Sequence, residues 1–303
     1  EIKHRLVHAN PFHQSYWLTR RYMDIKLSDF KNLGLIALQP ILIAFLIIFA
    51  FENLIEVSPV NGNQVIESNA TDDFLDYEEN HVIAENESGE PIQTGKIGAL
   101  FIMAIAAIWF GVSNAAKEIV GELSVFRRER MFNLQLTPYI TSKVIVLTFL
   151  SFVQICIFLF ILFLHYEDLQ FFVETGVFLL WVSIVSIVFG LMLSSITNTS
   201  TEVMSILPIA LMPQIILAGI IQPIQNDITV LLSYLTIGRW GTEGLARIQD
   251  IGRDNELFLK IIDIHLYQHN SFLASDGLFN NLFILSLLLI AMLLVTYHFL
   301  NSK

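Results

Sequence analysis

The sequence predicts an all-α integral membrane protein with six transmembrane helices, an N-terminal amphipathic helix and short helices outside the membrane core. One reason is composition, because 54% of the 303 residues are hydrophobic and only 15% are charged, whereas a soluble domain carries about 25% charged residues. The other reason is that six runs lack Asp, Glu, Lys and Arg, and each can supply the ~20 residues that cross a bilayer as a helix. The runs cover 33–51, 97–116, 144–164, 175–201, 203–226 and 277–302.

The basic residues predict the orientation of the chain. If the N-terminus is cytoplasmic, the inner segments hold twelve Lys and Arg residues and the outer segments hold five, as the positive-inside bias expects. Both termini are therefore expected in the cytoplasm. The acidic residues gather outside, since 52–90 holds eleven Asp and Glu residues and no Lys or Arg. The net charge of −11 therefore does not indicate a nucleic-acid partner.

The N-terminal segment, 1–31, predicts an amphipathic helix that lies along the inner membrane surface. At 100° per residue its large apolar side chains share one face, with polar side chains elsewhere. Residues 32–303 then form the six-span transmembrane domain, and Pro40 is expected to kink the first span. The apolar face consists of Phe12, Tyr16, Met23, Leu27 and Phe30.

Two external sections are expected. Residues 55–94 form an acidic insertion without the residue spacing of a calcium loop, which favours a solvated acidic surface. Residues 224–276 form the second section, and its apolar stretch 228–238 is too short to cross, which predicts a re-entrant or interfacial helix. The fifth span leads into this section and is expected to be bent or broken at Pro208 and Pro213.

Residues 118–137 predict a charged cytoplasmic helix between the second and third spans. An anchor that binds lipid phosphates would explain its arginines, but not the interleaved Glu118, Glu122 and Glu129. A charged helix fused to the end of a span is suited to docking on a soluble partner that drives the membrane domain. The third span is expected to begin at 137–138, because Thr favours the N-cap and Pro the first helical position.

The sequence shows no pattern of catalytic residues. It lacks a P-loop, a zinc-protease motif and a nucleophile elbow, and the single Cys156 has no intrachain disulfide partner. His265 and His269 have the spacing of a shared metal on a helix, but no third ligand is evident, and two surface histidines are the alternative. The spans lack ionisable residues, which argues against an ion-coupled transporter. Hydrogen bonds between helices are expected from Gln39, Asn114, Gln154 and Gln214.

The charged segment resembles the coupling-helix region of the G-subfamily-type (ABC-2-like) ABC transporters. The resemblance rests on EIVGELSVFRRER at 118–130, followed by Tyr139, Ser142 and Lys143. LTRRY at 18–22 is similar to the elbow helix of that family. LAGII at 217–221 and SYLTIGRWGTEGL at 233–245 are similar to the exit of its fifth span and its external re-entrant helices. The acidic insertion is a departure, because the first external loop of the family is shorter.

This resemblance implies a half-transporter of the bacterial inner (plasma) membrane, in which two copies assemble around a central cavity. ATP and Mg would bind a nucleotide-binding domain, either fused (as in members that also carry FHA modules) or on a separate chain. That domain would drive alternating access and export. The residues implied in coupling to the ATPase are Arg20, Arg21, Glu118, Glu122, Phe126, Arg127, Arg128, Glu129, Arg130, Tyr139 and Lys143.

The resemblance also implies where a substrate and a gate would lie. The apolar character of the cavity predicts a lipidic or amphipathic substrate, and ordinary helix packing is the alternative role for each lining residue. No cofactor, metal or catalytic residue is expected in the chain itself. The implied residues are Met103, Trp109, Phe110, Met212 and Ile216 in the cavity, Gly219, Ile220 and Ile221 in the gate, and Arg239, Trp240 and Glu243 in the external helix.

Other classes of function remain as alternatives. A membrane scaffold or signalling subunit could use the same charged segment to recruit a cytoplasmic partner, and the absence of an associated P-loop ATPase would favour it. A membrane-embedded enzyme needs a buried pair of polar catalytic residues, and a channel needs a polar stripe at helical spacing. Neither pattern is evident in the spans.

Overall fold

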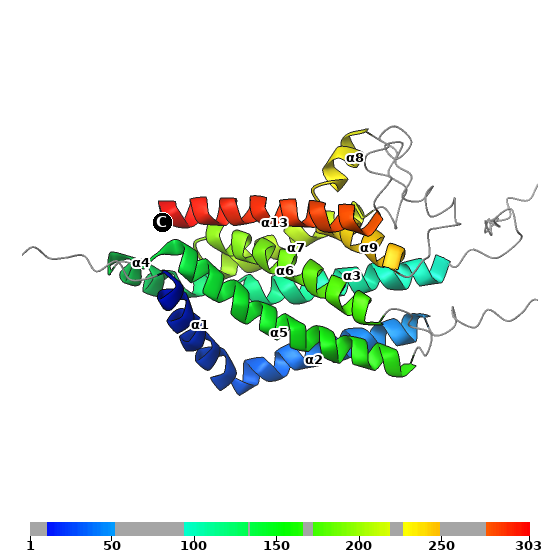
Figure 1. Ribbon diagram of the computed structural model, residues 1–303, viewed down its shortest axis with the longest axis horizontal. Coiled ribbons are helices and arrows are strands. Elements are labelled where there is room, and N and C mark those ends of the chain that lie inside the picture. The colour runs from blue at the N-terminus through cyan, green and yellow to red at the C-terminus, as the bar shows by residue number, and fades with distance from the viewer. Residues whose placement is uncertain (1–10, 52–93, 133, 166–171, 219–226, 249–276) are drawn as a thin grey trace, which may run out of the picture.

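The computed structural model describes residues 11–51, 94–132, 134–165, 172–218, 227–248 and 277–303 (Figure 1). These residues form helices and the turns between them, without a strand, so the predicted all-α class is confirmed for the described part of the chain. The helices are α1 (Pro11–Ser28), α2 (Phe30–Phe51), α3 (Thr94–Ala115), α4 (Leu123–Met131), α5 (Leu136–His165), α6 (Phe172–Ile196), α7 (Ser200–Ile216), α8 (Asp227–Ser233), α9 (Ile237–Ile248) and α13 (Gly277–Ser302), with a 3₁₀ turn, η2, at Val120–Glu122.

Five helical segments of the described chain are long and apolar enough to cross a membrane. They are α2, α5, α6, the segment Gly98–Met131 that contains α3, and Leu278–Ser302 within α13. The remaining predicted span corresponds to α7, which is apolar but only 17 residues long. It continues through Pro208 and Pro213 and ends at Ile216, and the end of the predicted span, 219–226, lies outside the described residues.

The centre of the bundle is the contact between α3 and α6, which depends on small residues. A Cβ atom added at Gly111 would lie 2.5 Å from the carbonyl oxygen of Ser183. A Cβ atom added at Gly190 would lie 2.8 Å from the Cβ of Ala115. Small residues let two helix backbones approach closely, which is a common basis of helix association in membranes. These four residues therefore fix the separation of the two helices.

Side-chain amides connect α2, α3 and α5 inside the bundle, as the sequence predicts. The Gln154 amide nitrogen donates to the carbonyl oxygen of Ile36 at 2.9 Å and to the side-chain oxygen of Gln39 at 3.3 Å. The side-chain amide of Asn114 donates to Gln154 at 2.6 Å. The prediction that these amides hydrogen-bond between helices is confirmed.

The first two helices meet at a sharp bend at the edge of the bundle (Figure 1). Asp29 is the one non-helical residue between them, and its carboxylate accepts a hydrogen bond from the backbone N–H of Asn32 at 3.2 Å. An Asp in this position satisfies a free amide in the first turn of a helix. Phe12, Tyr16 and Phe30 of the predicted apolar face are exposed in the single chain, as expected for side chains that contact lipid.

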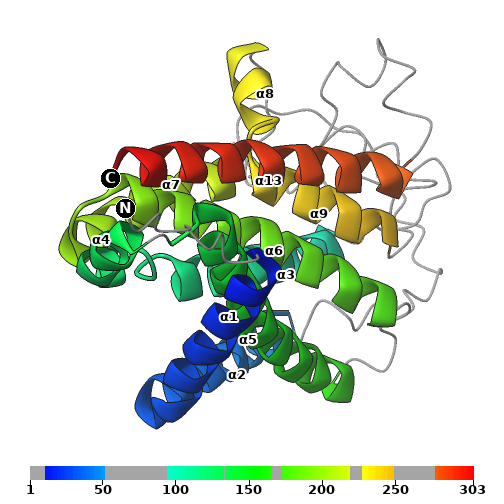
Figure 2. The same ribbon diagram turned by 60° about the vertical axis from the view of Figure 1, so that its left-hand side comes forward.

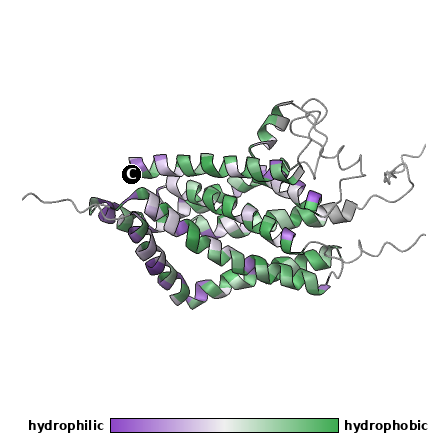
Figure 3. Ribbon diagram, in the orientation of Figure 1, coloured by the Kyte–Doolittle hydropathy of each residue, from purple (hydrophilic) through white to green (hydrophobic). Residues whose placement is uncertain are grey.

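Polar side chains gather at one end of the bundle. In Figure 3 the hydrophilic colour is concentrated on α1 and α4, whereas the long helices are coloured mainly as hydrophobic along their lengths. Figure 2 shows the C-terminus of the chain at this same end. We call it the α4 end, and the opposite end, with α8 and α9, the α9 end.

Two predicted helices differ from the structure. The segment 118–137 is not one helix, because a turn and η2 precede α4, and α5 already begins at Leu136. The apolar stretch 228–238 is divided between α8 and α9 by a turn after Ser233. The start of α9 is held by a side chain of another helix, α7. The Gln214 side-chain oxygen accepts hydrogen bonds from the N–H groups of Ile237 at 2.7 Å and Gly238 at 3.3 Å.

Candidate functional site

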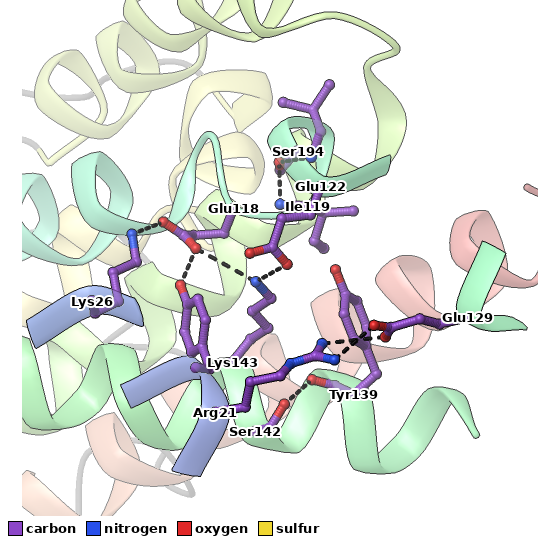
Figure 4. Close-up of polar contacts among 12 residues, drawn as sticks. Arg21, Lys26, Glu118, Ile119, Glu122, Glu129, Tyr139, Ser142, Lys143 and Ser194 are labelled. Atoms are coloured by element: carbon purple, nitrogen blue, oxygen red, sulfur yellow. Dashed lines mark hydrogen bonds and ion pairs between the residues drawn. The ribbon is translucent and has the colours of Figure 1, made fainter. Parts of the chain in front are cut away.

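The connection between α3 and α4 is anchored on α6. After α3 ends, the backbone N–H groups of Ile119 and Val120 both donate to the Ser194 hydroxyl of α6, at 3.1 and 3.0 Å (Figure 4). Buried backbone donors in a turn need partners of this kind. The turn is thus held against the rigid α3–α6 pair, and it places the following glutamates toward α1 and α5.

Glu118 is the centre of a charged network at the α4 end. Its carboxylate is largely buried and accepts hydrogen bonds from the Tyr22 hydroxyl and the Lys26 ammonium, both on α1. The ammonium of Lys143, on α5, lies 3.6 Å from the same carboxylate. Burial and the charge of Glu118 raise the pKa of Tyr22, so its hydroxyl remains a donor at physiological pH.

Lys143 completes the network from α5. Only 2% of its surface is exposed, and its ammonium lies 2.5 Å from the Glu122 carboxylate and 3.8 Å from the centre of the Tyr22 ring. A buried cation is tolerated when carboxylates and an aromatic face replace its water. We call Tyr22, Lys26, Glu118, Glu122 and Lys143 the charge network; it joins α1, the α3–α4 connection and α5 (Figure 4).

The inward side of α4 is tied to three other helices. Phe126 is buried with its ring centre 4.9 Å from that of Tyr139 on α5. Glu129 accepts hydrogen bonds from Arg21 of α1 at 2.7 and 3.2 Å, and this contact raises the pKa of Arg21. Arg130 donates to the carbonyl oxygen of Leu300 and to the backbone and side-chain oxygens of Asn301 at 3.0 and 2.9 Å, so it caps the end of α13.

The outward side of α4 has a different composition. Arg127 and Arg128 are exposed, and Met131 and Phe132 are 79% and 82% exposed. No ion pair or hydrogen bond of the two arginine side chains is found within the described residues. Basic side chains next to exposed large apolar ones are a common composition of a protein-docking surface. We call these four residues the outward surface of α4.

The predicted coupling residues therefore separate into two groups. Most of them make contacts within the chain: Arg21, Glu118, Glu122, Phe126, Glu129, Arg130, Tyr139 and Lys143. Arg127 and Arg128 face outward, and Arg20 lies near the Trp17 ring on the exposed side of α1, 5.8 Å from its centre. The glutamates that a lipid anchor does not explain are explained by these intramolecular ion pairs.

The predicted cavity residues lie in three different surroundings. Met103 and Phe110 are buried in the helix packing. Met212 and Ile216 are exposed on α7. Trp109 is 42% exposed and lines a cavity of about 650 Å³ among α1, α2, α3, α5 and α7. The predicted gate, 219–221, lies outside the described residues.

The predicted external-helix residues are buried at the α9 end. The Arg239 guanidinium donates to the Ser233 hydroxyl and lies 4.4 Å from the centre of the Tyr234 ring and 5.1 Å from that of Trp240. Glu243, also buried, pairs with Arg247 at 2.8 Å. Gly238 is needed here, because an added Cβ atom would lie 2.3 Å from the carbonyl oxygen of Gln214.

The structure offers no metal site among the residues that it describes, since no three His, Cys, Asp or Glu side chains there are grouped to hold an ion. His265 and His269 lie outside the described ranges, as does the part of the acidic insertion up to residue 93. Cys156 is a free thiol on α5.

Comparison with known proteins identifies the fold family. Residues 13–249, from α1 to just past the end of α9, match the family described as ABC-2 type transporter. The chain belongs to this family. The chain is also similar to the ABC transporter ATP-binding/permease protein Rv1747 of Mycobacterium tuberculosis (strain ATCC 25618 / H37Rv), with 29% identity over 174 residues. That match covers 53% of this chain and 19% of the relative, so the chain spans only a small part of the relative's length.

Sequence reasoning about this ABC-2 membrane domain missed Tyr22 and Lys26 as site residues. A signal for them was present, because Tyr22 and Lys26 lie four residues apart, as do Tyr139 and Lys143, and both lysines contact Glu118. Side chains at this spacing lie on the same face of a helix. The spacing alone does not tell which faces meet, and that information comes from the fold.

Proposed function

We propose that this ABC-2 membrane domain is the permease of an ATP-driven exporter, and that its charge network transmits the motion of an ATPase to the spans. A nucleotide-binding domain, fused or on a separate chain, would bind ATP with Mg and dock on the outward surface of α4. The N- and C-termini and α4 would lie in the cytoplasm, and the protein in the bacterial inner membrane.

The observation that carries this proposal is the asymmetry of α4. One side of this short helix is bound to α1, α5 and α13 through Glu129, Phe126 and Arg130. The other side presents Arg127, Arg128 and two exposed apolar residues. A helix fixed to several spans on one side and unpartnered on the other, within the described residues, is suited to receive a push and distribute it.

Similarity to a mycobacterial ABC transporter protein supports ATP as the energy source. The similar mycobacterial protein is named as an ATP-binding and permease protein, which joins the two functions in one molecule. By analogy, α1 with residues 1–31 would act as the elbow helix, 118–137 as the coupling region, and 224–276 as the external re-entrant section of a 32–303 transmembrane domain. Two copies would enclose a cavity that alternates between the two sides of the membrane.

The substrate would be lipidic or amphipathic. The exposed side chains Trp109, Met212 and Ile216 would face the cavity between the copies, and 219–221 would form its external gate. All three exposed side chains are apolar, and burying apolar surface is the main source of affinity for such ligands. Met103 and Phe110 contribute to the packing behind that surface.

The test is ATPase activity of the full-length transporter in lipid nanodiscs. Arg127→Ala, Arg128→Ala and Phe132→Ala together remove three of the four side chains of the outward surface without touching the inward contacts. We expect the triple variant to insert and fold, but to lose at least the larger part of its lipid- or substrate-stimulated ATP hydrolysis. Loss of a docking hot spot typically weakens binding by about 2 kcal/mol or more.

The matched control is Phe30→Ala with Lys31→Ala, which removes an exposed aromatic and an exposed cation at the start of α2. It should leave stimulated hydrolysis unchanged. Equal activity of the triple variant and wild type would contradict a role of α4 in docking. The absence of any ATPase associated with the purified protein would contradict the exporter and favour a membrane scaffold that recruits another cytoplasmic partner.

A further inference from the structure

The cavity beside Trp109 has a polar end and an apolar end. At the α4 end it is lined by Lys26, Lys117 and Glu118, with Asn32 nearby. Toward the middle of the bundle the lining is mainly apolar, with leucines of α2 and α5 and Met204 and Leu207 of α7, and it also includes the side chains of Gln39, Ser113 and Asn114. Its volume of about 650 Å³ lies within the usual range of ligand sites, about 300–1,000 Å³. An amphipathic cavity of this form fits a ligand with a polar head and an apolar chain.

The charge of the lining is not balanced. Lys26 forms an ion pair with Glu118, which leaves Lys117 as the one lining cation without an opposite charge among the described residues. The other buried or half-buried cation of this region, Lys143, is already paired with Glu118 and Glu122. The cavity therefore has an excess positive charge at its polar end, and it favours an anionic head group.

A hydrogen-bonding group lies at the same end of the cavity. The side-chain amide of Asn32 has no hydrogen-bond partner among the described residues, since only its backbone N–H is used, in the contact with Asp29. An amide offers both a donor and an acceptor, which suits a hydroxyl-bearing head group. In contrast, the amides of Asn114 and Gln39 deeper in the cavity are already engaged with α5 and α3.

We propose that this cavity binds an anionic membrane phospholipid, with its phosphate at Lys117 and its acyl chain along α2 and α7 beside Trp109. The ammonium of Lys117 pairs with the phosphate, and Asn32 hydrogen-bonds the head-group hydroxyls. The lipid is the occupant because the cavity combines an unpaired cation with an apolar wall on helices that contact the bilayer. As a statement about the exported substrate class the inference rests on the proposed function, whereas lipid binding itself needs no ATPase.

The experiment uses the fluorescence of Trp109 in the full-length protein in nanodiscs of phosphatidylcholine. Phosphatidylglycerol with brominated acyl chains is added at a fixed mole fraction, and brominated phosphatidylcholine is the reference quencher. The contribution of Trp109 is the difference between the wild type and Trp109→Phe, since Trp17, Trp181 and Trp240 are common to both. We expect the anionic lipid to quench Trp109 more strongly than the reference lipid. The expected preference for the anionic lipid is about fivefold, because one unpaired lysine attracts its phosphate.

Three variants separate the site from general attraction of anionic lipid to the surface. Lys117→Gln should reduce the preference to that of the reference lipid, and Lys117→Arg should retain most of it. Lys31→Gln, which removes an exposed lysine outside the cavity lining, should leave the preference unchanged. Equal loss in Lys117→Gln and Lys31→Gln would overturn the proposal in favour of a general surface effect.

Two further outcomes would also overturn it. Equal quenching of wild-type Trp109 by both lipids would mean that the cavity accepts lipid without regard to charge. No quenching by either lipid would mean that another part of the protein, such as a second copy of the chain, covers the cavity. These measurements are made without ATP, so they test lipid binding separately from transport. If the protein shows the lipid preference but no ATPase activity, the lipid site is supported and the proposed exporter function is rejected.

Discussion

Lys143 at the α4 end and Arg239 at the α9 end are both almost fully buried cations, but different groups stabilise them. Lys143 has two carboxylates, from Glu118 and Glu122, and the face of the Tyr22 ring on α1. Arg239 has a hydroxyl and two aromatic rings that all lie within six residues of it. Its Nε and second terminal nitrogen have no hydrogen-bond partner in the described structure.

The difference shows what each end is built to do. The partners of Lys143 come from other segments, so its ion pairs hold α1, the α3–α4 connection and α5 in one arrangement. The partners of Arg239 are local, so its contacts fix only the turn between α8 and α9. Ion pairs that connect several helices suit the α4 end to transmitting movement between them. Contacts confined to one turn suit the α9 end to keeping a constant local conformation.

The largest expected effect is that of Glu118→Ala. This change leaves Lys26 and Lys143 without their shared carboxylate, and breaking a buried ion pair costs roughly 3–5 kcal/mol. Thermal unfolding in detergent should show this loss, and hydrogen exchange should become faster in α1. Glu122→Ala, at a more exposed carboxylate, is the control and should cost less. Unchanged exchange in α1 would mean that the network does not hold this helix.

Arg239→Met should have a smaller effect. The variant loses the stacking of the guanidinium on two rings, worth about 2 kcal/mol when desolvated. It also removes buried donors that lack partners, each of which costs about 1–3 kcal/mol, so the two effects largely cancel. The same unfolding assay should give a loss well below that of Glu118→Ala. A loss as large as that of Glu118→Ala would contradict the contrast between the two ends.

The smallest expected effect is that of Arg21→Gln. The ion pair with Glu129 is partly exposed, with half of the Arg21 side chain accessible, and such pairs contribute about 0–1 kcal/mol. Stability should hardly change, and the difference from wild type should decrease further at high salt. A loss insensitive to salt would show that this contact belongs to the buried network rather than to the surface.

Much of the membrane architecture could be predicted from charge-free runs, but the burial of Lys143 and its contacts could not. The third span was predicted to begin at 137–138, close to the observed start of α5 at Leu136, but Lys143 was expected to take part in coupling to the ATPase, whereas it is buried inside the chain. The lysine is tolerated there because Glu118 and Glu122 are brought to it by the fold. The separation of these residues along the sequence does not indicate that they are in contact in the fold.

The division of 228–238 was missed for a similar reason. Local hydropathy is continuous across this stretch, and no Pro or Gly marks its middle. The break arises because Gln214, on α7, accepts from the first N–H groups of α9. The contacts of Glu129 and Arg130 also depend on tertiary structure, since their partners lie on α1 and α13. By contrast, the amide contacts of Gln154 were predictable, because a buried amide in an apolar span needs a partner.

The close packing of α3 on α6 has a consequence for observing this protein at work. Gly111 and Gly190 leave no space for these two helices to approach further, and Ser194 fastens the turn after α3 to the same neighbour. The α3–α6 pair can therefore serve as a fixed reference for distance measurements within the protein. Spectroscopic labels placed on these two helices define a fixed frame, against which the displacement of α1, α7 or α13 during a working cycle can be measured in ångströms.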